Sequence, residues 1–271
     1  MLWRRNFMHR KKLIIGNWKM HGRLKWNESI ISEFTRNVQS LNNVNMGLCV
    51  PFPYLSQAQH LLSSTNVAWG AQNVSQFEDG AYTGSISAFM VAEFGCTYTI
   101  IGHSERRALS SETFDSASNR FMQALNAGLT PIFCVGEKED EREKGYAKAV
   151  VESQVRSVLG TLDEEILEKM YSQKTVFAYE PAWAIGTGIH AQPETAEEMH
   201  QMIRALIAEK NPNYAKQVKI IYGGSLTPEN SESLFSMENI DGGLVGRCSI
   251  DPQSFIKLCH VANQLNCGEK G

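Results

Sequence analysis

Short apolar runs rich in β-branched and aromatic residues recur along the whole chain, and stretches of mixed polarity separate them. We count eight such runs, and each predicts a β-strand. They lie at residues 13–18, 46–50, 67–71, 98–102, 130–135, 175–180, 218–223 and 240–246.

The stretches between the apolar runs carry hydrophobic residues every three or four positions, which is the spacing of an amphipathic helix. Residues 28–38, 114–125, 151–159 and 199–207 have this pattern. Strands that are apolar throughout are buried on both faces, as in a parallel sheet covered by helices. Eight strand–helix repeats in 271 residues therefore favour an α/β fold with a closed eight-stranded parallel (β/α)8 barrel.

The alternative is an open, doubly wound parallel sheet. Such a sheet usually carries a GxGxxG motif after its first strand, but here that strand runs into Gly16, Asn17, Trp18 and Lys19. Length alone allows one or two domains, and no Pro/Gly/Ser-rich linker interrupts the series. We therefore expect a single barrel domain over 12–265, a basic and disordered extension over 1–11, and a short tail over 266–271.

The first residues also allow a transit peptide or a start at Met8, although the segment is poor in Ser and has no signal-like apolar stretch. Residues 1–12 hold five Lys and Arg and no acid, so the rest of the chain is acidic although the formal net charge is only -3. An acidic body argues against nucleic-acid binding, and no apolar stretch suits a membrane span. The charge run at 137–144 predicts a solvated helical surface.

Six scattered cysteines show no CxxC pair and no metal-ligand spacing with histidine, so they predict reduced thiols in the cytoplasm and no bound metal. Cys134 lies inside an apolar run and is interpreted as a buried core residue.

Polar residues just after the strands are the candidates for chemistry, because active sites of such barrels lie at the carboxyl ends of the strands. Asn17 and Lys19 follow the first strand, His103 follows the fourth just before a helix expected from Ser104, and Glu180 ends the sixth. Taken singly, the lysine and the histidine fit a structural role at least as well. Glu105 with Glu180 could also form a glycosidase pair, although the short connections argue against a sugar cleft.

Two kinds of loop complete the prospective site. The apolar, glycine-bearing loop at 181–188 is typical of a lid rather than a helix. Glycine pairs at 223–224 and 242–243 follow or form the last two strands, where such barrels bind phosphate through backbone N–H groups.

Seven stretches stand in the order found in the triosephosphate isomerase family, which the chain resembles over about residues 12–265. They are GNWKM (16–20), WGAQN (69–73), IGHSERR (101–107), PIFCVGE (131–137), AYEPAWAIGTG (178–188), IYGGS (221–225) and DGGLVG (241–246). The resemblance implies a single-domain TIM barrel that interconverts glyceraldehyde 3-phosphate and dihydroxyacetone phosphate in glycolysis and gluconeogenesis, through an enediol(ate) and without cofactor or metal.

The resemblance also assigns roles to residues. Glu180 is expected to move the proton, with His103 as the electrophile and Asn17 and Lys19 on the oxyanion side; this family is itself a standard example of a neutral histidine beside a helix N-terminus. Backbone N–H groups of Gly186, Ser225, Gly246 and Arg247 are expected to bind the phosphate.

In the family the loop corresponding to 72–85 inserts into a second subunit, which implies a homodimer with Thr83 near the partner's active site. The sequence differs from the residues usual in the family at His21, Ser85, Ile189–His190 and Arg247. Two other functions stay open: an epimerase or lyase acting on another sugar phosphate, and a binding protein that kept the scaffold without catalysis.

Overall fold

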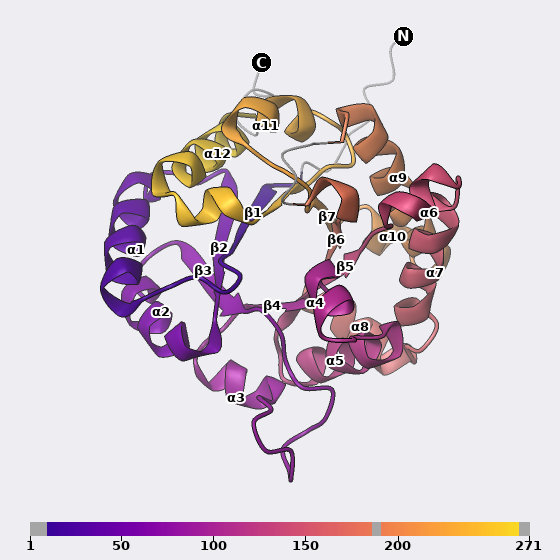
Figure 1. The fold of residues 1–271 in the computed structure, drawn as a ribbon, viewed down its shortest axis with the longest axis horizontal. Coiled ribbons are helices and arrows are strands. Elements are labelled where there is room, and N and C mark those ends of the chain that lie inside the picture. The colour runs from indigo at the N-terminus through magenta and orange to yellow at the C-terminus, as the bar shows by residue number, and fades with distance from the viewer. Residues whose placement is uncertain (1–9, 186–190, 266–271) are drawn as a thin grey trace.

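Eight parallel strands close into a barrel in the computed structural model, which describes residues 10–185 and 191–265. The strands are β1 Lys12–Asn17, β2 Val44–Val50, β3 Val67–Ala71, β4 Tyr98–Ile101, β5 Thr130–Val135, β6 Val176–Tyr179, β7 Lys219–Tyr222 and β8 Gly242–Val245. Each pairs with its neighbours in chain order, and β1 pairs with β8 (Figure 1). The predicted closed barrel and all eight strands are confirmed.

The barrel closes where β1 meets β8, with Leu13 opposite Gly242. A Cβ atom at Gly242 would lie 2.0 Å from the Leu13 carbonyl oxygen, and Gly242 has a φ of +136°. Only glycine combines that backbone conformation with so close an approach. Gly242, the first residue of β8, therefore serves closure of the barrel.

Helices surround the barrel, as Figure 1 shows. They are α1 Leu24–Val38, α2 Leu55–Leu62, α3 Ala88–Glu93, α4 Ser104–Leu109, α5 Phe114–Asn126, α6 Glu139–Glu143, α7 Ala147–Leu159, α8 Glu164–Ser172, α9 Pro193–Lys210, α10 Pro212–Ala215, α11 Pro228–Phe235 and α12 Pro252–Leu265. Short 3-10 turns lie at η1 Phe52–Tyr54, η2 Ala182–Ala184 and η3 Arg247–Ile250. The four segments with helical periodicity fall in α1, α5, α7 and α9, so those predictions are confirmed.

Hydrophobic side chains pack on both faces of the strands. A small cluster fills the barrel interior, and a much larger one lies between the barrel and the helices. Leu13 and Ile15 point into the first cluster, whereas Ile14 of the same strand belongs to the second. This double burial explains why the strands are apolar throughout.

Two local predictions are corrected by the structure. The run at 137–144 is not solvated throughout, because Glu137 has no exposed surface even though α6 beyond it is largely exposed. The loop after β6 was expected not to form a helix, but η2 gives it one short 3-10 turn.

The amino end of the barrel carries a buried charge network around Asp241, which is 1% exposed. Its carboxylate accepts hydrogen bonds from Arg10 and Arg204, each at 2.6 Å, and from the backbone N–H of Ile220 at 2.8 Å. Arg10, within the segment expected to be a disordered extension, is thus tied to the barrel. Residues 1–9 and 266–271 lie outside the described residues.

A long loop between β3 and α3 projects from the barrel, at the bottom of Figure 1. Near its tip the rings of Phe77 and Tyr82 stack with centroids 4.4 Å apart, and they stay 43% and 44% exposed. Among the described helices, none is long and apolar enough to cross a membrane.

Candidate active site

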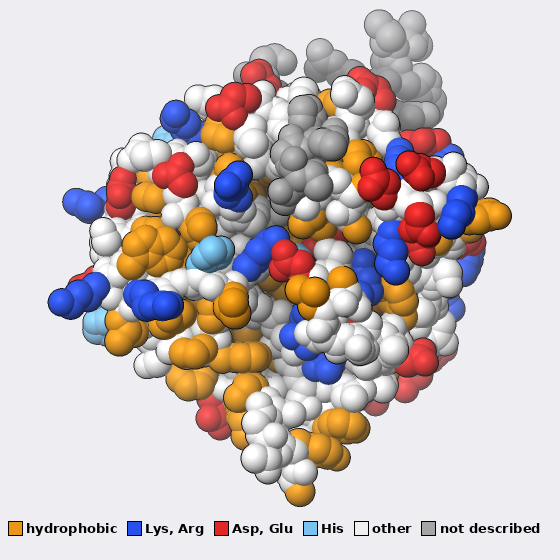
Figure 2. Space-filling view, in the orientation of Figure 1, with side chains coloured by type: hydrophobic (Ala, Val, Ile, Leu, Met, Phe, Trp, Pro, Cys, Tyr) orange, Lys and Arg blue, Asp and Glu red, His pale blue; other side chains and the backbone are white. Residues whose placement is uncertain are grey.

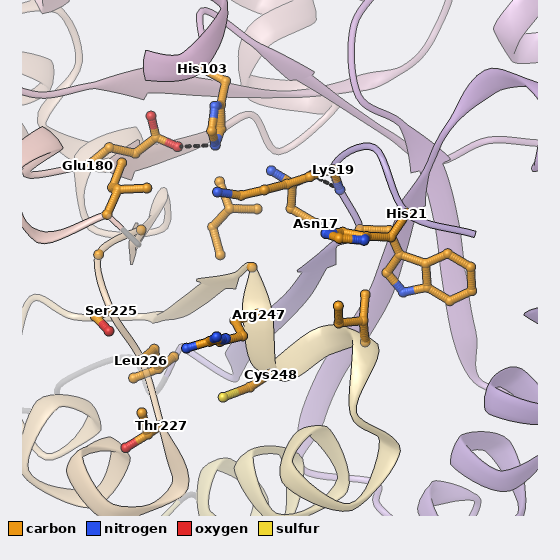
Figure 3. A pocket seen from close by; sticks show the side chains of 17 residues that line it. Asn17, Lys19, His21, His103, Glu180, Ser225, Leu226, Thr227, Arg247 and Cys248 are labelled. Carbon is orange, nitrogen blue, oxygen red and sulfur yellow. Dashed lines mark hydrogen bonds and ion pairs between the residues drawn. The ribbon is translucent and has the colours of Figure 1, made fainter. Parts of the chain in front are cut away.

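A cavity of about 630 Å³ opens at the carboxyl ends of the strands. It brings together residues that end or follow β1, β4, β6, β7 and β8, among them Asn17, Lys19, His103, Glu180 and Ser225 (Figure 3). The sequence predicted these residues separately from strand ends, and the barrel places them around one space.

Glu180 follows β6 directly and is completely buried. Its Oε2 atom accepts a hydrogen bond from the backbone N–H of Ser104 at 2.9 Å, whereas Oε1 has no hydrogen-bond donor. Oε1 lies beside Nε2 of His103, and a fully buried carboxylate is costly unless it is paired. Oε1 is the atom of this site best placed to accept a proton from a bound molecule.

His103 caps the N-terminus of α4, the helix predicted to begin at Ser104. Its Nδ1 atom accepts a hydrogen bond from the backbone N–H of Glu105 at 3.2 Å, which leaves Nε2 to carry the proton of a neutral ring. Nε2 lies 3.2 Å from Oε1 of Glu180 (Figure 3), although that contact lacks the orientation of a hydrogen bond. The imidazole can therefore offer an N–H donor beside the carboxylate.

Lys19 reaches the cavity from an unusual backbone conformation, with a φ of +52°. The side chain of Asn17 supports it, because Oδ1 of Asn17 accepts a hydrogen bond from the Lys19 backbone N–H at 3.0 Å. The Lys19 ammonium group pairs with Oε1 of Glu105 at 2.5 Å. Non-glycine residues adopt positive φ only at a cost, and of the described residues that do so, Lys19, Ser111 and Lys174, only Lys19 lines the cavity.

Glu105 has a role that the sequence reasoning missed. It both donates its backbone N–H to His103 and holds the Lys19 ammonium through its carboxylate, so one residue orients two prospective catalytic groups. Its position two residues after His103 at the start of a helix was the available signal, but only spatial proximity reveals the link to Lys19.

The loops after β7 and β8 form the other end of the cavity. The backbone N–H of Ser225 donates to the carbonyl oxygen of Ala184 at 3.1 Å, so this donor becomes available to a ligand only when that bond is exchanged. The hydroxyl of Tyr222 accepts a hydrogen bond from the backbone N–H of Ala191 at 3.1 Å. Both described flanks of the loop after β6 are thus attached to β7 or the loop that follows it.

Gly246 and Arg247 complete this end of the cavity, and Arg247 is not among the residues with positive φ. An arginine is therefore tolerated there without strain in its own backbone. Gly186 and the pair Ile189–His190 lie outside the described residues.

Glu137 is a second residue that the sequence reasoning misjudged, and it supports the segment after Glu180. Its carboxylate accepts hydrogen bonds from the Tyr179 hydroxyl at 3.1 Å and from Nε1 of Trp183 at 2.9 Å, and it pairs with Arg142 at 2.9 Å. Burial raises the pKa of Tyr179 well above its usual value, and the Glu137 carboxylate raises it further. The tyrosine therefore remains a hydrogen-bond donor.

Cys134 is fully buried, as predicted for a core residue. Burial raises the pKa of its thiol well above the usual value, and the neighbouring Glu180 carboxylate raises it further. The thiol stays protonated and does not compete with Glu180 as a base. Within residues 10–185 and 191–265, no three His, Cys, Asp or Glu side chains form a group that could hold a metal ion.

Known proteins match this chain over nearly its full length. A family model described as Triosephosphate isomerase matches residues 12–262. Relatives named triosephosphate isomerase include that of Dechloromonas aromatica, 45% identical over 94% of this chain and 100% of the relative. Those of Methylococcus capsulatus, at 45% over 93% and 98%, and Nitrosomonas eutropha, at 42% over 94% and 99%, match similarly. The sequence resemblance is thereby confirmed, and the chain belongs to the triosephosphate isomerase family.

Proposed function

We propose that Glu180, His103, Lys19 and Asn17 catalyse the isomerisation in the cavity described above. As a member of this family, the chain is an enzyme that interconverts glyceraldehyde 3-phosphate and dihydroxyacetone phosphate. The observation that carries the assignment to these residues is the fully buried Glu180 carboxylate at the cavity, whose Oε1 atom lies 3.2 Å from Nε2 of His103.

The proposed reaction begins when Oε1 of Glu180 takes a proton from the carbon next to the substrate carbonyl. The electrons of the broken C–H bond form a C=C bond, and the carbonyl oxygen gains negative charge. The His103 Nε2–H group and the Lys19 ammonium stabilise this charge, because preorganised donors are most effective where charge develops. Return of the proton from Glu180 to the neighbouring carbon, with proton exchange between the two oxygens, completes the isomerisation.

Asn17 and Glu105 would act mainly on Lys19. Asn17 supports the positive φ of Lys19, and Glu105 holds the ammonium group. An ammonium group has three donors, so its ion pair with Glu105 leaves donors for the substrate.

We further propose that the phosphate binds at the opposite end of the cavity, to backbone N–H groups of Gly186, Ser225, Gly246 and Arg247. The close approach of glycine backbone and the position after the last two strands support this assignment for the described residues. Because Ser225 donates to Ala184, phosphate binding would exchange that bond and so act on the loop at 181–188, which we propose as the cover of the site.

A coupled assay with glyceraldehyde 3-phosphate tests the central proposal. Wild type and Glu180→Gln are compared, since the amide keeps the shape of the side chain but cannot take the proton. We expect wild-type turnover and a loss of several orders of magnitude in kcat for the variant. Comparable turnover in both proteins would refute the role of Glu180.

We also propose that two copies of the chain form a homodimer through the loop at 72–85. A second cavity, of about 300 Å³, adjoins the first and is lined by Lys19, Met20, Phe52 and Glu105 among others. Met20 is 95% exposed, and hydrophobic side chains are visible between the projecting loop and the barrel in Figure 2. Insertion of the loop of a second copy would cover this surface and bring its Thr83 to the site.

Sedimentation velocity at micromolar concentration tests the dimer. Tyr82→Asp places a charge in the proposed contact. Tyr146→Asp is the control, because Tyr146 is also exposed, at 59%, but lies at the N-cap of α7, outside the loop at 72–85. We expect a dimer for wild type and control and a monomer of reduced activity for Tyr82→Asp. A fully active wild-type monomer would contradict the proposal.

Two further proposals concern location and domain limits. The cysteines that the structure describes are all free, which supports a cytoplasmic location for the enzyme. We propose 12–265 as the barrel domain, since β1 begins at Lys12 and α12 ends at Leu265.

A further inference from the structure

The guanidinium group of Arg247 has no assigned partner although it lies at the cavity that holds Glu180. Arg247 opens η3, directly after β8, and its side chain is exposed at the cavity wall. Figure 3 shows the side chain extended toward the loop that carries Ser225, Leu226 and Thr227. Among the residues that the structure describes, no hydrogen bond or ion pair engages its guanidinium group.

The charges around the cavity make this arginine distinctive. Glu180 is the acidic residue that lines the cavity. Its carboxylate accepts a hydrogen bond from Ser104 and faces His103, at the end of the cavity opposite Arg247. The other cation that lines the cavity, Lys19, already pairs with Glu105. The Arg247 charge is thus left without an acidic partner among the described residues, in a concave space where potentials are focused.

We propose that the Arg247 side chain binds the phosphate dianion of the substrate directly through its guanidinium fork. This inference rests on the proposed function, but it adds a side-chain cation to a phosphate site described so far only by backbone N–H groups. The planar guanidinium group matches two phosphate oxygens at once, which a lysine ammonium does not.

Steady-state kinetics of three variants test the role of the side chain. Arg247→Gln removes the charge and keeps the backbone N–H, and Arg247→Lys keeps the charge and removes the fork. Arg36→Gln, the control, removes an exposed arginine of α1 that does not line the cavity. Ionic strength is held low and constant, because salt screens exposed charges.

For Arg247→Gln we expect KM to rise about tenfold, the equivalent of about 1.4 kcal/mol, with kcat within about twofold of wild type. Arg247→Lys should recover only part of the loss, and Arg36→Gln should match wild type. A KM of Arg247→Gln equal to that of the Arg36→Gln control would overturn the proposal. Full recovery by Arg247→Lys would also overturn it, because charge alone would then suffice without the fork.

Calorimetric binding of inorganic phosphate separates this inference from the proposed function, since it requires no turnover. We expect the Kd for phosphate to rise about tenfold in Arg247→Gln and to stay unchanged in Arg36→Gln. If wild type fails to isomerise the triose phosphate but phosphate binding still depends on Arg247, the proposed function fails and the anion site stands. If wild type isomerises the triose phosphate but the Kd for phosphate is unchanged in Arg247→Gln, the proposed function stands and the inference about Arg247 fails.

Discussion

Gly223 sets the position of the proposed base, and adding a single methyl group there should impair catalysis without unfolding the protein. A Cβ atom at position 223 would lie 2.7 Å from Cγ of Glu180 and 3.3 Å from the carbonyl oxygen of Tyr179. Ordinary contacts between carbon atoms are about 3.5–4.0 Å, so the Glu180 side chain has to move by roughly 1 Å. Gly223 itself is absent from the residues with positive φ, so alanine meets no backbone conflict there.

The magnitude follows from the precision that proton transfer needs. A misplacement of about 1 Å costs about a hundredfold in rate, and we therefore expect kcat of Gly223→Ala to fall about a hundredfold. Overpacking of a dense core costs about 1–3 kcal/mol, so the variant should remain folded. KM should change little, because the phosphate site is not displaced.

Gly47→Ala provides the matched control. Its added Cβ would lie 2.9 Å from Cδ1 of Ile15, a similar overlap inside the barrel but without contact to the site residues. We expect a comparable loss of stability in urea unfolding and an unchanged kcat in the coupled assay. If Gly223→Ala retained wild-type kcat, or if both variants lost activity equally, positioning of Glu180 by Gly223 would be refuted.

Three further changes probe the site and its support. Glu180→Asp withdraws the carboxylate by one methylene, so kcat should fall by about a hundredfold or more with KM little changed, and near-wild-type turnover would remove Glu180 from its role. Glu137→Ala leaves the Trp183 and Tyr179 donors without their shared acceptor and should cost about 2–5 kcal/mol in denaturant unfolding; an unchanged midpoint would show that the network does not contribute. Burial lowers the pKa of His200 to about 4, so the unfolded chain binds the extra proton between pH 6.5 and 4 and stability should fall by about 1.4 kcal/mol per pH unit as pH falls through that window. His200→Gln should show a shallower decline than wild type, and equal slopes would contradict this assignment.

The barrel was predictable because its signal is local. Each strand is an uninterrupted apolar run, and burial on both faces requires that pattern whatever the neighbouring strand is. The position of His103 was predictable for a similar reason, since α4 begins at the next residue and needs a cap. Glu180 stood out as an acid at the end of an apolar run.

The contacts that tune the site were not predictable in the same way. The ion pair of Lys19 with Glu105 joins residues 86 positions apart, and the bond from Trp183 to Glu137 spans 46 positions. Glu137 looked like the first residue of a solvated charge run, but tertiary contacts with β6 and the loop after it bury the side chain. Composition along the chain carries no signal for such a partner.

The Oε1 atom of Glu180, which accepts no hydrogen bond of good geometry from the described residues, supports the proposed site more specifically than the cavity does. Among the described side chains, a few other buried polar atoms also lack a hydrogen-bond partner, but they belong to Trp, Thr, Arg, Gln and His residues rather than to an acid. A hydroxyl or an amide without a partner costs little compared with a carboxylate, whose charge has to be stabilised in the folded state. The fold tolerates the cost of burying Glu180 in a cavity that Lys19 and His103 also line. Lys19 is held there at positive φ, and Nδ1 of His103 already accepts a hydrogen bond from Glu105. Backbone strain at Lys19 and incomplete hydrogen bonding at Glu180 thus occur at one cavity, as expected where binding of substrate supplies the missing interactions.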